Sequence, residues 1–88
     1  MTTRHVIVPW KKGLHLRAAT KLVRLAQTFS SSISIRYHGQ VANLRSIVSV
    51  IGLCAVMGSC LVIEVTGDDE QEALQAVEQV FAMKDTAD

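Results

Sequence analysis

The spacing of apolar residues between positions 16 and 29 constrains the fold of this chain more than any other feature. These residues recur three and four positions apart, which is the period of one face of an α-helix. The basic residues Arg17, Lys21 and Arg24 lie one turn apart on another face. The sequence therefore predicts an amphipathic helix over residues 16–28, ended by serines at 30–32. Its apolar face consists of Ala19, Leu22, Val23, Ala26 and Phe29.

The other elements follow from similar patterns. A short helix is expected from Ser46, as its cap, through Gly52, and a last helix is expected to begin at Asp68 or Asp69. The order is β-α-β-β-α-β-α without repeats or linkers, so we expect residues 1–88 to form a single domain. The strands are expected over residues 4–8, 33–37, 40–42 and 61–65. The apolar face of the last helix consists of Ala73, Leu74, Val77, Val80 and Phe81.

His15 is expected at or next to the N-cap of the first long helix. The first backbone N–H groups of a helix lack intrahelical acceptors, and the helix dipole favours negative charge there, so this position is suited to an anion. A histidine can itself be phosphorylated, and Arg17 can give a bidentate contact to phosphate oxygens. The sequence indicates transient storage of a phosphoryl group; the alternative interpretation is a solvated helix cap without function.

The stretch Gly13-Leu14-His15-Leu16-Arg17-Ala18-Ala19 resembles the active-site motif of the HPr family. These proteins are the histidine-containing phosphocarriers of the bacterial phosphoenolpyruvate-dependent phosphotransferase system (PTS). The similarity runs from about residue 4 to residue 81 and includes a second motif at residues 44–48. It implies an α+β fold, an open-faced β-sandwich in which three helices cover one face of a four-stranded antiparallel sheet.

The resemblance also implies a function. His15 would accept a phosphoryl group from phospho-enzyme I, which is charged by phosphoenolpyruvate, and would donate it to an enzyme IIA component. Arg17 would stabilise the phosphate. Such a protein is a stoichiometric carrier rather than an enzyme, and the function requires no cofactor.

The chain departs from the family pattern at three positions. Ala18 stands where the family usually has proline, Leu16 where it usually has a small residue, and Lys12 where a small polar residue is common. Alanine keeps the helix and adds one N–H group that can face a phosphate. We therefore expect the departures to affect the choice of partner more than the chemistry.

Ser46 is a second candidate site. Capping of the short helix explains a serine there, while in many family members the matching serine is phosphorylated by an HPr kinase/phosphorylase. An alternative function follows, that of a regulatory binding protein acting through Ser46 and partner binding rather than phosphoryl flux. The resemblance and the charge pattern together give the partner-binding candidates Leu16, Thr20, Lys21, Arg24, Arg45, Ile47, Val48 and Ile51.

Charge is divided unevenly along the chain, although the formal net charge is only +1. Eight of the 9 lysines and arginines precede Ser46, and every acidic residue lies at or after Glu64. Basic residues around His15 would steer acidic partner surfaces toward the site, although a solvated basic face without function gives the same pattern. Aromatic content of 5% and the lack of an aromatic-basic motif argue against nucleic acid as a partner.

The remaining features point to a cytoplasmic protein, and the resemblance to the HPr family implies a monomer. Polar residues interrupt the apolar stretch 47–65, so we expect no membrane insertion, and no apolar leader follows Met1. Cys54 and Cys60 are expected in apolar surroundings as buried small residues, and no metal site is expected. Trp10 has two open interpretations, a partner contact or an anchor of the loop.

Overall fold

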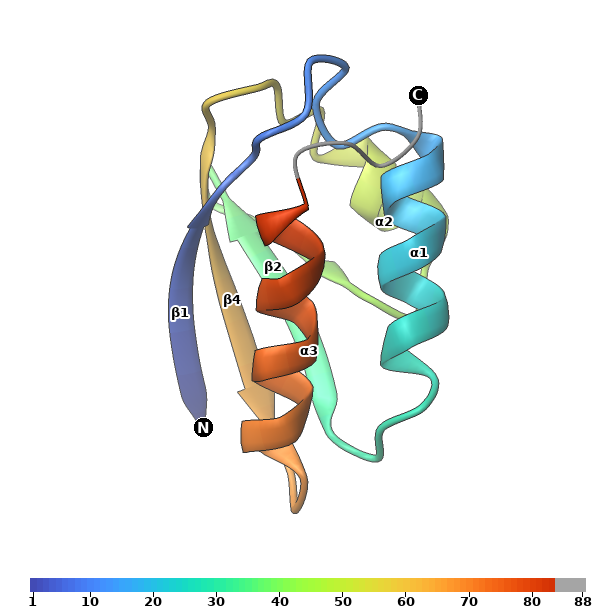
Figure 1. Ribbon diagram of the computed structural model, residues 1–88, viewed down its shortest axis with the longest axis vertical. Coiled ribbons are helices and arrows are strands. Elements are labelled where there is room, and N and C mark those ends of the chain that lie inside the picture. The colour runs from blue at the N-terminus through green and yellow to red at the C-terminus, as the bar shows by residue number, and fades with distance from the viewer. Residues whose placement is uncertain (84–88) are drawn as a thin grey trace.

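The computed structural model describes residues 1–83, and residues 84–88, which include Lys84 and the end of the expected domain, lie outside the described part. The elements follow the predicted order β-α-β-β-α-β-α (Figure 1). The strands are β1 (Thr2–Ile7), β2 (Ser32–Tyr37), β3 (Gln40–Asn43) and β4 (Cys60–Thr66). The helices are α1 (Leu16–Ala26), α2 (Ile47–Gly52) and α3 (Glu70–Ala82).

The four strands form one antiparallel sheet in the order β1-β4-β2-β3. In the central strand β4, the buried residues Leu61, Ile63 and Val65 alternate with residues on the opposite face. Pairing of β2 with β4 sets Ile33 beside Val65 and Ile35 beside Ile63, so the apolar positions of both strands share one face. The expected fold class, an open-faced sandwich with one covered sheet face, is confirmed.

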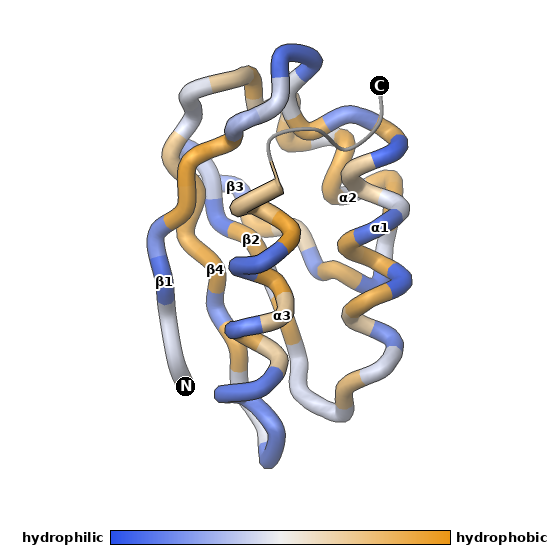
Figure 2. The backbone as a smooth tube through the Cα atoms, viewed as in Figure 1, coloured by the Kyte–Doolittle hydropathy of each residue, from blue (hydrophilic) through white to orange (hydrophobic). Residues whose placement is uncertain are grey.

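The helices bury their apolar stripes against that face of the sheet. Figure 2 shows the hydrophobic positions of α1 and α3 turned toward the sheet and toward each other. α1 packs against α2 and α3, and α3 packs against β1 and β4. All five residues of the predicted α3 face are buried. The buried residues of α1 are Ala18, Ala19, Leu22, Val23 and Ala26.

Two predictions about local structure were wrong. The first long helix ends at Ala26 rather than residue 28, because the Thr28 N–H and hydroxyl both donate to the Leu25 carbonyl, 3.0 and 2.7 Å away, and close a tighter turn. Phe29 consequently lies beyond the helix, half-buried against the core. Cys54 and Cys60 are exposed free thiols rather than buried residues, since Cys60 faces the uncovered side of the sheet and Cys54 lies in the loop after α2.

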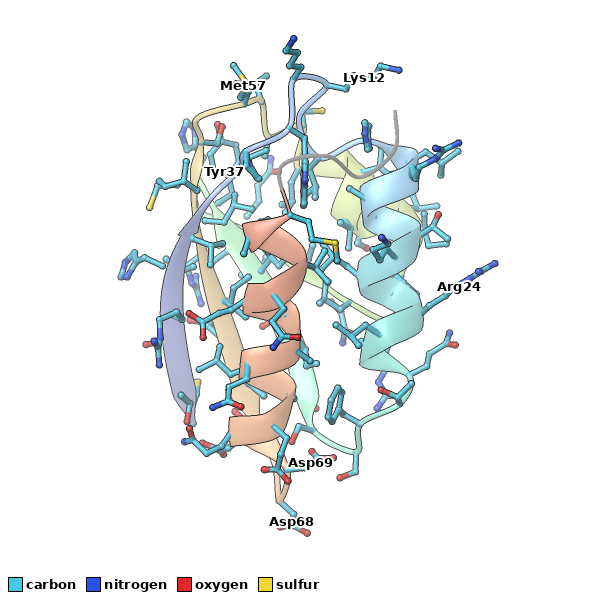
Figure 3. All side chains as sticks on the ribbon, in the orientation of Figure 1. Lys12, Arg24, Tyr37, Met57, Asp68 and Asp69 are labelled. Atoms are coloured by element: carbon cyan, nitrogen blue, oxygen red, sulfur yellow. The ribbon has the colours of Figure 1, made fainter. Side chains whose placement is uncertain are left out.

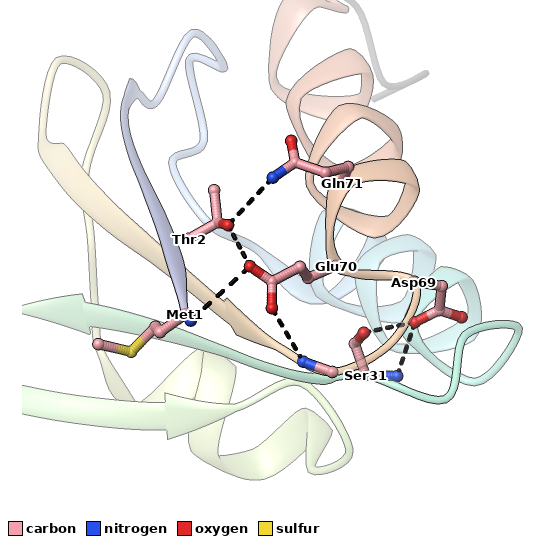
Figure 4. A network of polar contacts seen from close by, with 7 residues as sticks. Met1, Thr2, Ser31, Asp69, Glu70 and Gln71 are labelled. Atoms are coloured by element: carbon pink, nitrogen blue, oxygen red, sulfur yellow. Dashed lines mark hydrogen bonds and ion pairs between the residues drawn. The ribbon is translucent and has the colours of Figure 1, made fainter.

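The start of α3 holds a polar network that joins it to two other segments (Figure 4). Asp69 occupies the N-cap position but makes no side-chain cap hydrogen bond. Its carboxylate instead accepts from the Ser30 and Ser31 amides, both at 2.9 Å, and from the Ser31 hydroxyl. The neighbouring Glu70 accepts from the Thr2 hydroxyl and from the Gly67 amide. The two carboxylates therefore tie α3 to β1 and to the segment that enters β2.

These hydrogen bonds favour the charged carboxylates. The Ser31 hydroxyl and then the Ser30 amide hold the pKa of Asp69 below its ordinary value. The Thr2 hydroxyl and then the Gly67 amide lower the pKa of Glu70 in the same way. A pKa that is lower in the folded than in the unfolded chain contributes stability above the unfolded pKa, and this contribution is lost as the pH falls toward the folded pKa.

We predict that Asp69→Asn lowers the free energy of unfolding at about pH 6, and that the difference from the wild-type chain narrows by about pH 3. The reason is that protonation of Asp69 removes the same charge that the amide removes. Urea unfolding at both pH values measures the effect. Asp68→Asn, at an exposed neighbouring position, is the matched control. A difference that stays constant across this range would contradict the prediction.

Candidate functional site

The candidate site lies where two loops meet at the start of α1. Residues 8–15, between β1 and α1, run beside residues 53–59, between α2 and β4 (Figure 1). The Val8 N–H donates to the Ser59 carbonyl, and the Gly58 N–H returns to the Val8 carbonyl, both at 2.9 Å. Nearer His15, the Leu14 N–H donates to the Ala55 carbonyl, also at 2.9 Å. These bonds fix the backbone that leads into α1.

Gly13 is required by this contact between the loops. Its φ is +71°, in the left-handed region that side chains other than hydrogen disfavour. A Cβ atom built at this position would collide with the Ala55 carbonyl oxygen and would lie 3.0 Å from the Val56 Cα. The glycine therefore lets the loop before His15 approach residues 55 and 56 closely.

Trp10 is an anchor of the loop, which decides between its two interpretations. The side chain is 1% exposed, so it presents no surface to a partner. Its Nε1–H donates to the Met83 carbonyl at 2.6 Å, and its ring lies 5.1 Å from that of Phe81 between centroids. The Trp10 ring also lies near the His15 ring. The angle between the two ring planes is 11°, and their centroids are 6.4 Å apart. The indole thus ties the site to the end of α3.

His15 is the N-cap of α1, as predicted. Its backbone is extended, with φ −86° and ψ 179°, and its Nδ1 accepts a hydrogen bond from the Ala18 N–H at 3.1 Å. The His15 carbonyl accepts from the Ala19 N–H at 2.9 Å, which is the first helical bond of α1. The ring is half-buried. A histidine thus fills the position where serine or aspartate is common in other helices.

The surface around His15 is hollowed in two places. A hollow of about 280 Å³ is lined by His15, Leu16, Arg17 and Lys12. A neighbouring hollow of about 460 Å³ follows the outer face of α1. Leu16 and Arg17 belong to both, and the second is completed by Thr20, Lys21 and Arg24. Phosphoryl chemistry at His15 would therefore face two cationic side chains and one exposed leucine, which is 63% exposed.

The second motif forms the cap and first turn of α2. The Ser46 Oγ accepts from the Ser49 N–H at 3.2 Å, which confirms the predicted cap. The apolar residues that follow divide between two roles: Val48 is 80% exposed, whereas Ile47 and Ile51 are half-buried against the core. Arg45 is exposed, and its amide donates to the Asn43 Oδ1 at 2.9 Å. Because α2 packs against α1, this segment extends the surface that begins at Leu16.

The basic residues gather around His15 only in part. Lys12 and Arg17 lie at the hollow beside His15, and Figure 3 shows Lys12 at the opposite end of the molecule from Asp68 and Asp69. Two arginines instead pair with acidic residues of the second half of the chain. Arg4 lies 3.5 Å from a Glu78 oxygen of α3, and the Arg36 Nε lies 3.3 Å from a Glu64 oxygen on the uncovered sheet face. Within residues 1–83, the ion pairs of these acidic residues therefore involve arginines of the sheet rather than those of α1.

The described residues lack the features of two other classes of site. Among residues 1–83, no three histidine, cysteine, aspartate or glutamate side chains gather to hold a metal ion. Within that same part of the chain, every helix is too short or too polar to cross a membrane.

Comparisons with known proteins agree with this geometry. The family model for the phosphorylation site of the PTS HPr component matches residues 2–83. The phosphocarrier protein HPr of Cupriavidus necator is 38% identical over 82 residues, which are 93% of this chain and 92% of that protein. The HPr of Lysinibacillus sphaericus is 39% identical over 77 residues, 88% of each chain. The crystal structure of HPr-C-His from Thermoanaerobacter tengcongensis matches with a TM-score of 0.90 and 31% identity, covering 96% of this chain and 94% of that one.

The fold and the histidine-capped helix define a phosphoryl carrier, which takes part stoichiometrically in a relay and is not an enzyme. The chain belongs to the HPr family, the phosphocarriers of the PTS.

We predict that Gly13→Ala destabilises the protein more than Gly39→Ala. Both glycines have positive φ, +71° and +79°, but a Cβ at Gly39 meets nothing within 4 Å. The control should therefore lose about 1 kcal/mol from backbone strain alone, whereas the collision with Ala55 should raise the loss at Gly13 to about 3 kcal/mol. Urea unfolding of both variants measures the difference. Equal losses would show that the loop can move away from residue 55 without cost.

Proposed function

We propose that His15 is the residue that carries the phosphoryl group and that Arg17 stabilises it. The observation that carries this proposal is the position of the His15 ring at the N-cap of α1, beside a hollow that Lys12 and Arg17 also line. A phosphoryl group bound to the ring would face the start of the helix, where backbone N–H groups and the dipole favour negative charge. The guanidinium of Arg17 can donate two parallel hydrogen bonds to its oxygens.

The chemistry is substitution at phosphorus between two imidazoles. An unprotonated ring nitrogen of His15 forms the new N–P bond while the N–P bond of the donor breaks, and the electron pair of that bond returns to the donor histidine. The chain contributes positioning and charge rather than bond activation. Because the group must be passed on, stabilisation on His15 has to be moderate.

We propose the outer face of α1 and the adjoining part of α2 as the docking surface for both partners. Its exposed apolar residues are Leu16 and Val48, and its cations are Lys21, Arg24 and Arg45. Thr20 completes it on α1, while the half-buried Ile47 and Ile51 of α2 pack against the core. An apolar centre with a cationic rim suits a partner of complementary shape and acidic charge. α1 itself contains no acidic residue that would oppose this.

The partners follow from membership of the family. We propose phospho-enzyme I as the donor and an enzyme IIA as the acceptor, with the protein acting as a monomer in the cytoplasm. An HPr kinase/phosphorylase acting on Ser46 stays a prediction. The contact that Ser46 makes is that of a helix cap, and capping alone accounts for a serine there.

Intact mass after incubation with phosphoenolpyruvate and enzyme I of the same organism tests the assignment of His15. We expect an acid-labile gain of one phosphoryl group in the wild-type chain and none in His15→Ala. The chain offers a matched control, because His5 is an exposed histidine on β1 and His5→Ala should label fully. Label that survives in His15→Ala, or none in the wild-type chain while a known HPr in the same mixture is labelled, would contradict the proposal.

Two variants that each remove one positive charge test whether the charge of α1 speeds phosphoryl transfer. We predict that Arg24→Gln slows phosphoryl transfer from phospho-enzyme I about two-fold at low ionic strength, and that added salt removes most of the difference. Arg36→Gln removes an equal charge that is paired with Glu64 on the uncovered sheet face, so it should leave the rate unchanged. Rapid-quench kinetics at two salt concentrations measure both. Equal slowing by both variants would indicate an effect of net charge rather than of the α1 face.

A further inference from the structure

The Ala18 amide has an unusual partner for a backbone group at the start of a helix. Ala18 is the third residue of α1, and an N–H group at this position has no carbonyl acceptor within the helix. It donates instead to the Nδ1 of His15, at 3.1 Å. The Ala18 side chain is fully buried, so the residue meets the site only through its backbone.

This hydrogen bond defines the protonation of the ring when the ring is neutral. A ring nitrogen that accepts a hydrogen bond carries no proton, so the proton of the neutral imidazole lies on Nε2. The lone pair that the amide engages on Nδ1 is then the one available to attack phosphorus. The contact that prepares the nucleophile must therefore break as the N–P bond forms.

We propose that the Ala18 amide is a positioning group that changes partners during phosphoryl transfer. Before transfer it holds Nδ1 as the unprotonated nitrogen, and after transfer it donates to an oxygen of the phosphoryl group on that nitrogen. In the step itself the Nδ1–P bond forms and the donor's N–P bond breaks. The Nε2 proton of His15 stays in place, and the donor leaves as a histidine with its own N–H. This inference rests on the proposed function of His15.

The change of hydrogen-bond partner by the Ala18 amide shifts the equilibrium of phosphoryl transfer between the donor and His15. A hydrogen bond to a charged phosphoryl oxygen is stronger than one to a neutral ring nitrogen. The amide consequently stabilises the phosphorylated state more than the free state. A proline at position 18, as in the usual family pattern, provides neither contact, because proline has no N–H.

The test compares Ala18→Pro with Ala18→Gly, which retains the amide. Equilibrium with phospho-enzyme I should lie about five-fold further toward the donor for Ala18→Pro than for the wild-type chain. Ala18→Gly should stay within about two-fold of the wild-type chain. The ¹⁵N shifts of the neutral His15 ring give a second readout: Ala18→Pro should raise the population protonated on Nδ1, and Ala18→Gly should not.

Measurements on the wild-type chain keep the proposal testable if Ala18→Pro fails to fold. The Ala18 amide should show through-bond coupling to Nδ1 in the free protein and to phosphorus in the phosphorylated protein. Phosphorylated wild-type protein without coupling to phosphorus, or an unchanged equilibrium in folded Ala18→Pro, would overturn the exchange and leave His15 as the carrier. A wild-type chain that accepts no phosphoryl group would overturn both the proposed function and the exchange.

Discussion

The hydrogen bond from the Leu14 amide to the Ala55 carbonyl is the contact on which the site depends. It joins two loops that are some forty residues apart in sequence, and it forms only because Gly13 lets the backbones meet without a side chain between them. With this contact in place, the chain enters α1 in the extended conformation that makes His15 the N-cap. Trp10 secures the same loop from the other side through the Met83 carbonyl. The His15 side chain thus lies at a junction of packed elements that hydrogen bonds hold together.

Within residues 1–83, the ion pairs of the acidic side chains involve the sheet and the N-terminus rather than the cations of α1. In that part of the chain, Asp69 ties the serine segment to α3 at the opposite end of the molecule from Lys12 (Figure 3). Glu64 pairs with Arg36 on the uncovered sheet face. The basic residues of α1 have no acidic residue on their own helix. A nearly neutral protein can therefore present a local positive field, and local field rather than net charge governs the approach of an acidic partner. The contacts of the acidic side chains within the described residues stabilise the fold and would leave the proposed docking surface on α1 positively charged.

The sequence predicted most of this architecture, and the reasons for its failures are physical. The periods of two and 3.6 residues identified the two long helices and the alternating strand, because burial of one face imposes them on the residues themselves. Turn and capping residues indicated the short third strand and the short helix. The N-cap roles of His15 and Ser46 were also predictable, since capping acts over three residues. The position of Asp69 at the start of the last helix was predicted as well, but its side-chain contacts were not. Its carboxylate accepts from amides nearly forty residues away rather than from the helix that it begins. The burial of Trp10 and the exposure of Cys54 likewise depend on contacts between distant segments.

A histidine at an N-cap couples the stability of a helix end to the chemistry of a side chain. Serine or aspartate in that position would satisfy the helix amides permanently, whereas the Nδ1 of His15 can satisfy the Ala18 amide only while it remains unmodified. Modification of the ring would remove this acceptor and, at the same atom, supply phosphoryl oxygens as replacements. Under the proposed exchange, the Ala18 amide would then have an acceptor in both states beside the half-buried ring. The backbone N–H would favour the charged acceptor only modestly, which suits a carrier that must both accept and release its cargo. It would change partners with little motion because it belongs to a helix that the core already holds.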